Sequence, residues 1–256
     1  MGLRSQNIEK LESENFDVLI IGGGINGAVS AAALTARGAR VALIDTRDFA
    51  GFTSQQSSNL VWGGIKYMEG YEFSLVAGLC KSRNELLLSF PSTVKEIRFL
   101  TSVTKGFRFH PLLMLAGTWL YWLLGRCKTQ TPKLLSRSQI AKREPLIKAD
   151  NSRGGVEYSD AYLHDNDARF VFNFIQNAID KGCIAANYIE SVTASRDQTG
   201  QWITEVEDQV SGDRFNIRSK TVINATGAFV DQYNQITGIE TDYCHVFSKG
   251  IHLVVP

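Results

Sequence analysis

Three glycines near the start of the chain have the spacing of a phosphate-binding turn. Gly22, Gly24 and Gly27 form the pattern G-x-G-x-x-G. In such a turn the first glycine permits a tight bend, the second lets the backbone approach a pyrophosphate, and the third lets a helix pack closely on a strand. The acidic Asp45 follows about twenty residues later, where a carboxylate can accept the hydroxyl groups of a ribose. These residues predict binding of a dinucleotide whose ribose carries no 2′-phosphate.

A second group of reactive side chains lies in the segment SSNLVWGGIKYMEGYEF, residues 57–73. Trp62 stands directly before Gly63 and Gly64, and Lys66 and Tyr67 follow at once. Loops usually carry small polar residues that suit turn geometry. A glycine pair flanked by two aromatic residues and a lysine is therefore unusual. From the residues alone, the simplest interpretation of Lys66 is a solvated lysine at the end of a loop.

The glycine pattern lies where a strand and a helix must meet. The apolar run FDVLIIGGG, residues 16–24, predicts a strand buried on both faces, and the alanine-rich segment 25–38 predicts a helix. A second apolar strand is expected over 39–45. The glycine pattern alone is weak, but with this β-α-β order and Asp45 it predicts a Rossmann-type nucleotide-binding turn.

Three further strands are expected in the second half of the chain, over 183–197, 202–209 and 214–227, with turns at QTGQ and SGDR between them. The last strand runs into Ala225, Thr226 and Gly227. A plain strand-to-helix turn would explain these three residues by themselves. In flavoproteins with this first β-α-β unit, such a turn returns the chain to the cofactor, which favours FAD over NAD.

Five segments together carry a resemblance to one enzyme family: IIGGGINGA (20–28), TSQQSSNLVWGGIKYMEGYEF (53–73), EYSDAYLHDNDAR (157–169), VINATGAFV (222–230) and KGIHLVVP (249–256). Through them the chain resembles the N-terminal half of the FAD-dependent glycerol-3-phosphate dehydrogenases, within the D-amino-acid-oxidase-like flavoprotein group. The resemblance implies an α/β fold, a Rossmann-type FAD-binding domain with an inserted α+β substrate or cap region.

The same resemblance sets the expected domain organisation. The chain stops within an expected strand, GIHLVVP, so we expect a C-terminally truncated protein. We expect a disordered N-terminus over 1–15 and an incomplete FAD-dependent oxidoreductase domain over 16–256, with FAD-binding parts at about 16–70, 140–200 and 215–240 and the cap or substrate region at about 71–139 and 241–256.

The resemblance and the glycine pattern also imply which residues contact ligands. The expected cofactor contacts are Gly22, Gly24, Ile25, Asn26, Gly27, Asp45, Thr46, Thr53, Ser54, Ser57, Ser58, Leu60, Trp62, Gly63, Gly64, Ala225, Thr226 and Gly227. Lys66 and Tyr67 are implied on the substrate side of the flavin. His252 is the implied proton acceptor, a role that the pKa range of histidine allows, although a structural role for a strand histidine stays open. The spacing of the cysteines and histidines predicts no metal site.

The implied reaction is oxidation of sn-glycerol 3-phosphate to dihydroxyacetone phosphate, with hydride transfer to the flavin and quinone as the next electron acceptor. Two departures from the family pattern bear on the substrate, because Trp62 stands where a histidine is common and Lys66 where an arginine is common. They keep open an FAD-dependent amine or amino-acid oxidoreductase. A non-catalytic flavin-binding fragment is the third interpretation.

Charge and hydropathy limit the expected partners. The formal net charge of +1 gives no electrostatic footprint for nucleic acid, and the polar N-terminus is no secretory signal, so we expect a cytoplasmic protein. Segment 111–124, PLLMLAGTWLYWLL, has no charge but is shorter than the about 20 residues that span a bilayer. It predicts either a helix on the cytoplasmic membrane surface or a buried helix of the substrate region. Nothing in the sequence indicates an oligomeric state.

Overall fold

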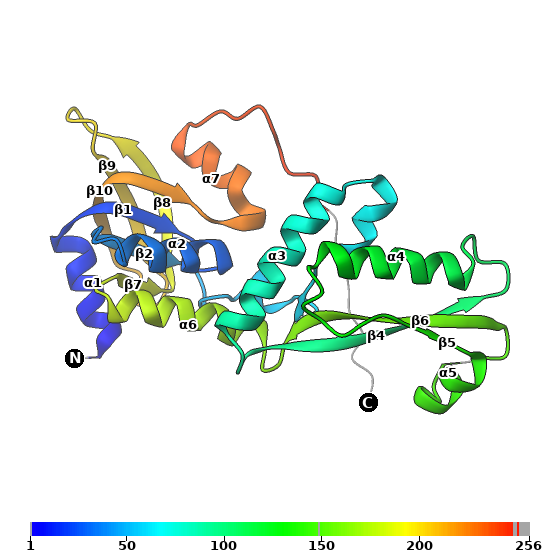
Figure 1. Cartoon of the computed structure of the whole chain (residues 1–256). Helices are drawn as coiled ribbons and strands as arrows, with labels where there is room; N and C mark the ends of the chain where they lie inside the picture. Colours follow the sequence, from blue (N-terminus) through cyan, green and yellow to red (C-terminus); the bar gives the residue numbers. More distant parts are fainter. Residues whose placement is uncertain (1, 148, 248–249, 251–256) are drawn as a thin grey trace. The chain divides into compact units, whose positions relative to one another are not determined.

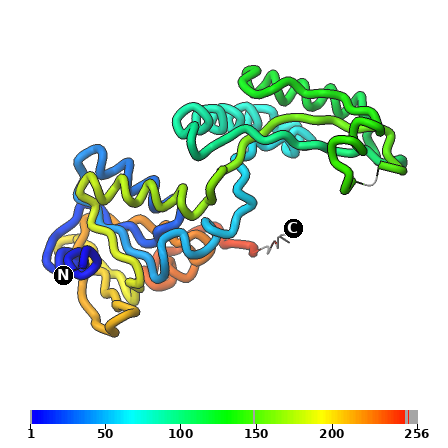
Figure 2. The backbone as a smooth tube through the Cα atoms, turned by 90° about the horizontal axis from the view of Figure 1, so that it is seen from below, coloured from blue at the N-terminus to red at the C-terminus, as the bar shows by residue number. Residues whose placement is uncertain are grey.

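The computed structural model describes residues 2–147, 149–247 and 250. It divides the chain into two compact units. Unit 1 comprises Met1–Ser58 and Asn166–Pro256, and unit 2 comprises Asn59–Asp165. The chain therefore leaves unit 1 once, builds the whole of unit 2 and returns, as the tube in Figure 2 can be followed to do.

Unit 1 is built on a six-stranded sheet with the order β7-β2-β1-β10-β9-β8. The first four strands in this order run parallel, and the last two pair antiparallel. The strands are β1 (Asn15–Ile21), β2 (Val41–Asp45), β7 (Ile184–Asn187), β8 (Ile189–Arg196), β9 (Trp202–Asp208) and β10 (Arg214–Asn224). The helices are α1 (Leu3–Ser13), α2 (Ile25–Thr35), α6 (Asp167–Asp180) and α7 (Val230–Thr237), with short 3-10 turns η1 (Thr53–Gln55) and η3 (Gly227–Phe229).

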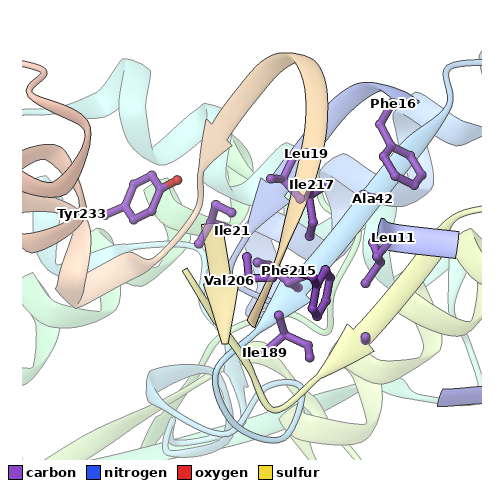
Figure 3. Close-up of a cluster of buried hydrophobic side chains, with 12 residues drawn as sticks. Leu11, Phe16, Leu19, Ile21, Ala42, Ile189, Val206, Phe215, Ile217 and Tyr233 are labelled. Atoms are coloured by element: carbon purple, nitrogen blue, oxygen red, sulfur yellow. The ribbon is translucent and has the colours of Figure 1, made fainter. Parts of the chain in front are cut away.

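Both faces of β1 and β2 are largely buried, which explains their mostly apolar sequences. Because successive side chains of a strand point to opposite faces, Ile20 of β1 and Leu43 of β2 pack with helices α2 and α6 on one face (Figure 1). Leu19 and Ile44 point to the other face. Figure 3 shows that second cluster, where Leu11 of α1 approaches the side chains of the sheet.

Helix α1 corrects the expectation of a disordered N-terminus over residues 1–15. The side chain of Leu11 is fully buried, and the Asn7 amide donates to the carbonyl oxygen of Ala185 at 2.8 Å. Arg4 binds the Asp208 carboxylate, with 2.6 Å between Nη2 and Oδ1. The segment is ordered because a few specific polar contacts supplement one buried leucine. Such contacts leave no periodic pattern in a polar sequence.

The expected strand over 183–197 is interrupted in the structure. Tyr188 has a φ of +57° and separates β7, which pairs parallel to β2, from β8, which pairs antiparallel to β9. A left-handed residue breaks the extended backbone, and here it allows one segment to join two parts of the same sheet.

Unit 2 contains an antiparallel sheet in which the long strand β6 is flanked by β3 and β4 and also pairs with β5. Helices α3 and α4 pack on this sheet, and α5 contacts β6 (Figure 1). The elements are β3 (Leu60–Val61), η2 (Ile65–Gly70), α3 (Phe73–Ser89), β4 (Val94–Thr104), α4 (Pro111–Leu124), β5 (Lys133–Leu135), α5 (Arg137–Arg143) and β6 (Ser152–Leu163).

Unit 2 corresponds to the insertion expected from the sequence, but its bounds differ. We expected 59–70 and 140–165 to belong to the FAD-binding part, whereas these residues fold with 71–139. The reason is β6, which hydrogen-bonds with β3, β4 and β5 and so ties both ends of the insertion into one sheet. Which segments contact the cofactor stays a prediction.

Candidate functional site

The turn between β1 and α2 has room only for glycine at two of its positions. Gly22 has a φ of +106°, and a Cβ added to it would lie 2.5 Å from the carbonyl oxygen of Ala225. A Cβ on Gly27 would lie 1.9 Å from the carbonyl oxygen of Gly22. The first contact brings the turn against the end of β10, and the second brings α2 against β1. The packing thus shows the tight bend expected at Gly22 and the close helix contact expected at Gly27.

The N-terminus of α2 is open to an anion. Gly24 is the N-cap residue, and the atom nearest to a Cβ added there would be the Ser54 hydroxyl oxygen at 3.1 Å, so little blocks an approaching ligand. That Ser54 Oγ accepts the N–H of Ile25 at 3.0 Å. The next N–H groups, on Asn26 and Gly27, precede the first acceptor that a helix can supply. They lie at the positive end of the helix dipole, which suits a pyrophosphate.

Asp45 is buried and shapes the same turn. Its Oδ2 accepts the N–H of Gly23 at 2.6 Å and its Oδ1 accepts the N–H of Arg47 at 2.8 Å. Burial raises the pKa of Asp45 above its ordinary value, while these two N–H donors work against that rise. Each carboxylate oxygen keeps a second acceptor position, so the side chain can still receive a ribose hydroxyl. Thr46, the next expected contact, is half-buried.

The loop after β2 returns to helix α6. The Ser57 N–H donates to Asp167 Oδ2 at 3.0 Å, and η1, which contains Thr53 and Ser54, packs near α6. Ser58 is exposed. The N-cap of α6 is Asn166, whose Oδ1 accepts the Arg169 N–H. Asp167, the first residue of α6, holds the serine loop through its bond to the Ser57 N–H.

The turn after β10 completes the edge of the unit 1 sheet. Asn224 Oδ1 accepts both the N–H and the hydroxyl of Thr226, at 3.3 and 2.7 Å. Beyond Gly227, the ring of Phe229 meets the ring of Phe52 edge-on at 5.0 Å between centroids. The Arg47 guanidinium lies 4.9 Å from the centroid of the Phe52 ring. These contacts tie the loop after β2 to the turn after β10.

In unit 2, the expected flavin loop begins at β3 and turns at a glycine pair. Leu60 pairs with Tyr162 of β6. Gly63 is buried, and its N–H donates to Asp160 Oδ1 at 2.9 Å. A Cβ on Gly63 would lie 2.1 Å from the Tyr121 hydroxyl oxygen. Gly64, with a φ of +80°, starts the 3-10 turn η2. Sequence reasoning did not single out Asp160 or Tyr121, although Asp160 lies within the EYSDAYL segment.

Three side chains project from this loop and remain accessible. Trp62 and Tyr67 are 37% and 42% exposed, and their ring centroids lie 5.6 Å apart. Lys66 is exposed between them in sequence, and it forms no ion pair within residues 2–147, 149–247 and 250. An aromatic pair beside an uncompensated cation can hold a small organic anion. His252, the expected proton acceptor, lies outside the described residues.

The structure thus assembles the predicted residues in two groups. In unit 1, the turns after β1, β2 and β10 converge at the carboxyl edge of the parallel strands, which is where open α/β sheets bind ligands. In unit 2, Trp62, Lys66 and Tyr67 come from one loop. Among the described residues, no group of three or more His, Cys, Asp or Glu side chains could hold a metal ion.

Comparison with known proteins decides the family. Residues 17–256 match the family described as FAD dependent oxidoreductase. The chain belongs to the FAD-dependent oxidoreductases. FAD is accordingly its cofactor, as the sequence predicted, and the glycine turn, the open start of α2 and Asp45 fit the pyrophosphate and ribose of that molecule.

Two curated relatives of this FAD-dependent oxidoreductase are named aerobic glycerol-3-phosphate dehydrogenase. The protein from Staphylococcus saprophyticus is 32% identical over 256 residues, which cover 99% of this chain and 46% of the relative. The protein from Staphylococcus aureus (strain USA300) is 31% identical over 255 residues, 98% of this chain and 45% of the relative. The chain therefore spans about half the length of the curated relatives it matches, and the resemblance seen in the sequence is confirmed.

Solved structures agree on the fold. The glycerol-3-phosphate dehydrogenase from Bacillus halodurans, complexed with FAD, superposes with a TM-score of 0.69 at 25% identity and covers 91% of this chain and 38% of that one. The L-α-glycerophosphate oxidase from Mycoplasma pneumoniae, with FAD bound, has a TM-score of 0.62 at 18% identity, covering 88% and 57%. The expected mixed α/β flavoprotein fold is confirmed.

Proposed function

We propose that this FAD-dependent oxidoreductase oxidises sn-glycerol 3-phosphate to dihydroxyacetone phosphate. The observation that supports this most is the similarity to relatives named aerobic glycerol-3-phosphate dehydrogenase across 99% of the chain. Lys66 adds a physical reason, because an exposed cation without an ion pair among the described residues can receive a phosphate dianion.

The proposed chemistry divides between cofactor and protein. When bound, FAD supplies the acceptor for the hydride that leaves the secondary carbon of the substrate. Lys66 binds the phosphate as a point charge, and the Tyr67 hydroxyl is available to orient the substrate. Trp62, packed on Tyr67, displaces water from the side of the substrate. The hydroxyl proton goes to a base, for which His252 is our proposal.

An amine or amino-acid substrate is the second candidate. The departures at Trp62 and Lys66 favour it, because a tryptophan lacks the titratable ring of a histidine and a lysine lacks the two-pronged geometry with which arginine grips a phosphate. A carboxylate, being smaller than a phosphate, is served as well by a single ammonium group. A flavin-binding protein without catalysis is the third candidate.

Anaerobic reduction of the bound flavin separates these candidates. The full-length protein is mixed with sn-glycerol 3-phosphate, with glycerol, and with a panel of amino acids, and the bleaching of the flavin band is followed. Fast bleaching by sn-glycerol 3-phosphate alone is the expected result. Bleaching by an amino acid instead would replace the proposal with the second candidate. A yellow protein that no substrate bleaches would favour the third.

We also propose that the electrons pass to quinone at the cytoplasmic face of a membrane, with α4 as the contact. Within the described residues no helix has the length and hydropathy to span a bilayer. Helix α4 nevertheless exposes Leu112, Leu113 and Leu123 by 58%, 59% and 56%, and basic residues follow it at Arg126 and Lys128. Exposed apolar side chains flanked by cations suit an interfacial helix.

Vesicle flotation tests the membrane contact. Full-length protein should float with vesicles containing anionic lipid, and the double variant Leu112→Gln/Leu113→Gln should remain in solution with its flavin bound. A matched change of two exposed residues elsewhere in unit 2, Leu88→Gln/Leu134→Gln, should leave flotation unchanged. Equal flotation of both variants would exclude α4 as the contact.

A further inference from the structure

A charged cluster lies fully buried in unit 2, outside the residues that the sequence assigned to ligands. Arg83 of α3 and Asp160 of β6 form an ion pair with 2.9 Å between Nη1 and Oδ1, and their side chains are 2% and 0% exposed. The Tyr121 hydroxyl of α4 lies 3.0 and 2.9 Å from the two Asp160 oxygens. Burial raises the pKa of Tyr121, so this hydroxyl remains a donor.

Burying such a cluster has a large desolvation cost, so it is an inefficient way to stabilise the packing of a sheet and two helices. Removing a guanidinium and a carboxylate from water costs several kcal/mol per ion, and well-packed apolar side chains of similar size often stabilise a fold as much or more. The surrounding Val76 and Cys80 show that apolar packing is available at this place. A role other than stability is therefore indicated for the charged groups.

The cluster ends on the backbone of the expected flavin loop. Asp160 Oδ1, besides binding Arg83, accepts the N–H of Gly63 at 2.9 Å. The Gly63 carbonyl oxygen is approached by the Cys80 sulfur at 3.6 Å, from the same interior. Both polar groups of this residue therefore point into unit 2. Trp62 precedes Gly63 and Lys66 follows it by three residues. Both side chains project outward and are exposed.

The fit around Gly63 leaves little freedom for another arrangement. A Cβ at this position would meet the Tyr121 hydroxyl at 2.1 Å and the Cys80 sulfur at 2.9 Å. Arg83 is itself fixed by Asn84, whose Oδ1 accepts from Nε and Nη2 at 3.3 and 3.1 Å, while Asn84 Nδ2 donates to the Gly125 carbonyl oxygen. The Asp160 carboxylate, which accepts the Gly63 N–H, is thus held in place by side chains of α3 and α4 as well as by its own strand β6.

We propose that Asp160, held by Arg83 and Tyr121, is a positioning residue that sets the orientation of the Gly63 peptide and thereby aims Trp62, Lys66 and Tyr67 at the substrate. This proposal rests on the proposed function, because it takes the loop to be the substrate-facing one. Asp160 is itself fully buried, so its effect on the substrate passes through the loop. It acts through one backbone hydrogen bond.

The test must separate orientation from folding. The double variant Arg83→Met/Asp160→Leu removes both charges together, so neither is left buried alone, and an apolar core of similar volume replaces them. It leaves the Gly63 N–H, the Tyr121 hydroxyl and Asn84 Oδ1 without these partners, so its melting temperature is expected to fall, but it is expected to fold and to bind FAD. Its kcat is expected to fall about 10-fold to 100-fold, since a small misplacement of a binding group has an effect of that size. Hydrogen exchange should show the amides of residues 60–67 losing protection.

A smaller change provides a graded second test. Tyr121→Phe removes one hydroxyl and should lower kcat a few-fold with normal FAD content. Gly63→Ala should lower kcat strongly, and combining it with Tyr121→Phe should restore part of the activity, because the closest clash is with the hydroxyl that the second change removes. Asp160→Glu should not restore the wild-type rate, since a longer side chain shifts the acceptor.

The matched control is another ion pair of the same sheet. Glu157 of β6 binds Arg98 and Arg143 at 3.2 and 2.7 Å, and Glu157→Gln should affect the melting temperature without changing kcat.

If the Arg83→Met/Asp160→Leu variant loses amide protection over 60–67 yet turns over at the wild-type rate, the positioning role is wrong. If wild-type protein does not oxidise sn-glycerol 3-phosphate, the proposed function fails, and the rates are then measured with whichever substrate bleaches the flavin. Equal losses in Glu157→Gln would also overturn the proposal, by making the effect one of general stability.

Discussion

Gly22 and Ala225, about 200 residues apart in sequence, meet so closely that a single methyl group on Gly22 would lie 2.5 Å from the Ala225 carbonyl oxygen. The contact joins the turn after β1 to the turn after β10, and these strands pair along their length. Glycine at position 22 is therefore required both by the backbone bend and by the contact between these two turns.

Gly22→Ala should abolish or severely weaken FAD binding, because the new Cβ must displace backbone atoms and the residue must also hold a φ of +106°. Gly38→Ala provides the control, since Gly38 also has a positive φ, +87°, but has open space around it. The measurement is the flavin-to-protein absorbance ratio of purified protein. A fully yellow Gly22→Ala protein would contradict this explanation of the turn.

Ser54→Ala should weaken FAD binding about 5-fold to 10-fold. The Ser54 hydroxyl accepts the Ile25 N–H at the start of α2, and loss of one such hydrogen bond costs about 1 kcal/mol. Titration of apo-protein with FAD, followed by fluorescence quenching, gives the dissociation constant. Ser82→Ala, on the exposed face of α3, should bind FAD as the wild type does, and a similar loss there would show that the effect is not local.

Lys66→Ala should raise KM for sn-glycerol 3-phosphate at least 10-fold and leave KM for glycerol nearly unchanged, because only the first substrate has a phosphate to pair with the ammonium group. Lys66→Arg should retain or improve binding. Steady-state kinetics with both substrates measure the difference, and Lys95→Ala, an exposed lysine of β4, serves as the control. Equal rises in KM for both substrates would assign Lys66 a structural role.

Arg4→Met should lower the free energy of unfolding by about 1 to 3 kcal/mol at neutral pH, as expected for a lost hydrogen-bonded ion pair. Burial acts to raise the pKa of Asp208, but Arg4 and the Val210 N–H outweigh it and hold the pKa below its ordinary value. A carboxyl group whose pKa is lowered by folding contributes stability above its unfolded pKa, about 3.9, and loses it as the pH falls through the folded value.

The difference between wild type and Arg4→Met should therefore be largest above about pH 5 and should shrink as the pH falls below about 4. Denaturant unfolding at a series of pH values measures it. Arg37→Met, which removes an exposed arginine just after α2 whose guanidinium donates to the Ala33 carbonyl oxygen, should show no such pH dependence. A constant difference down to pH 2 would mean that Asp208 is not the partner that matters.

The parts of the fold that local sequence patterns determine could be predicted, and the parts that depend on long-range polar contacts could not. The β1-α2-β2 unit was predictable because continuous apolar strands, a glycine turn and a small-residue helix each leave a local pattern, as Leu19, Gly22 and Ala31 illustrate. Helix α1 was missed because Arg4 and Asn7 dock through long-range polar contacts, which a polar sequence does not reveal.

The same limit applies within the candidate site. Lys66 could be singled out because it stands beside a glycine pair, but Asp160 and Arg83 resemble ordinary surface charges until α3 and β6 are packed together. Asp167 lies at the start of a helix, where an acidic residue is expected for local reasons. One of its partners, Ser57, lies 110 residues earlier in the chain. Only the tertiary fold brings such pairs together.

The insertion of unit 2 between two halves of unit 1 has a consequence for synthesis on the ribosome. Strand β1 can pair with β2 as soon as Asp45 has emerged, but its other neighbour, β10, is translated only after unit 2 and β7 to β9. At about 5 to 20 residues per second, the about 170 residues between β2 and β10 take roughly 8 to 34 s. During that interval the nascent chain carries one apolar strand with an unpaired edge, which invites pairing with other chains. Chaperone occupancy and translation speed should therefore govern the yield of this protein, and slowing the ribosome between β2 and β10 should lengthen the vulnerable period.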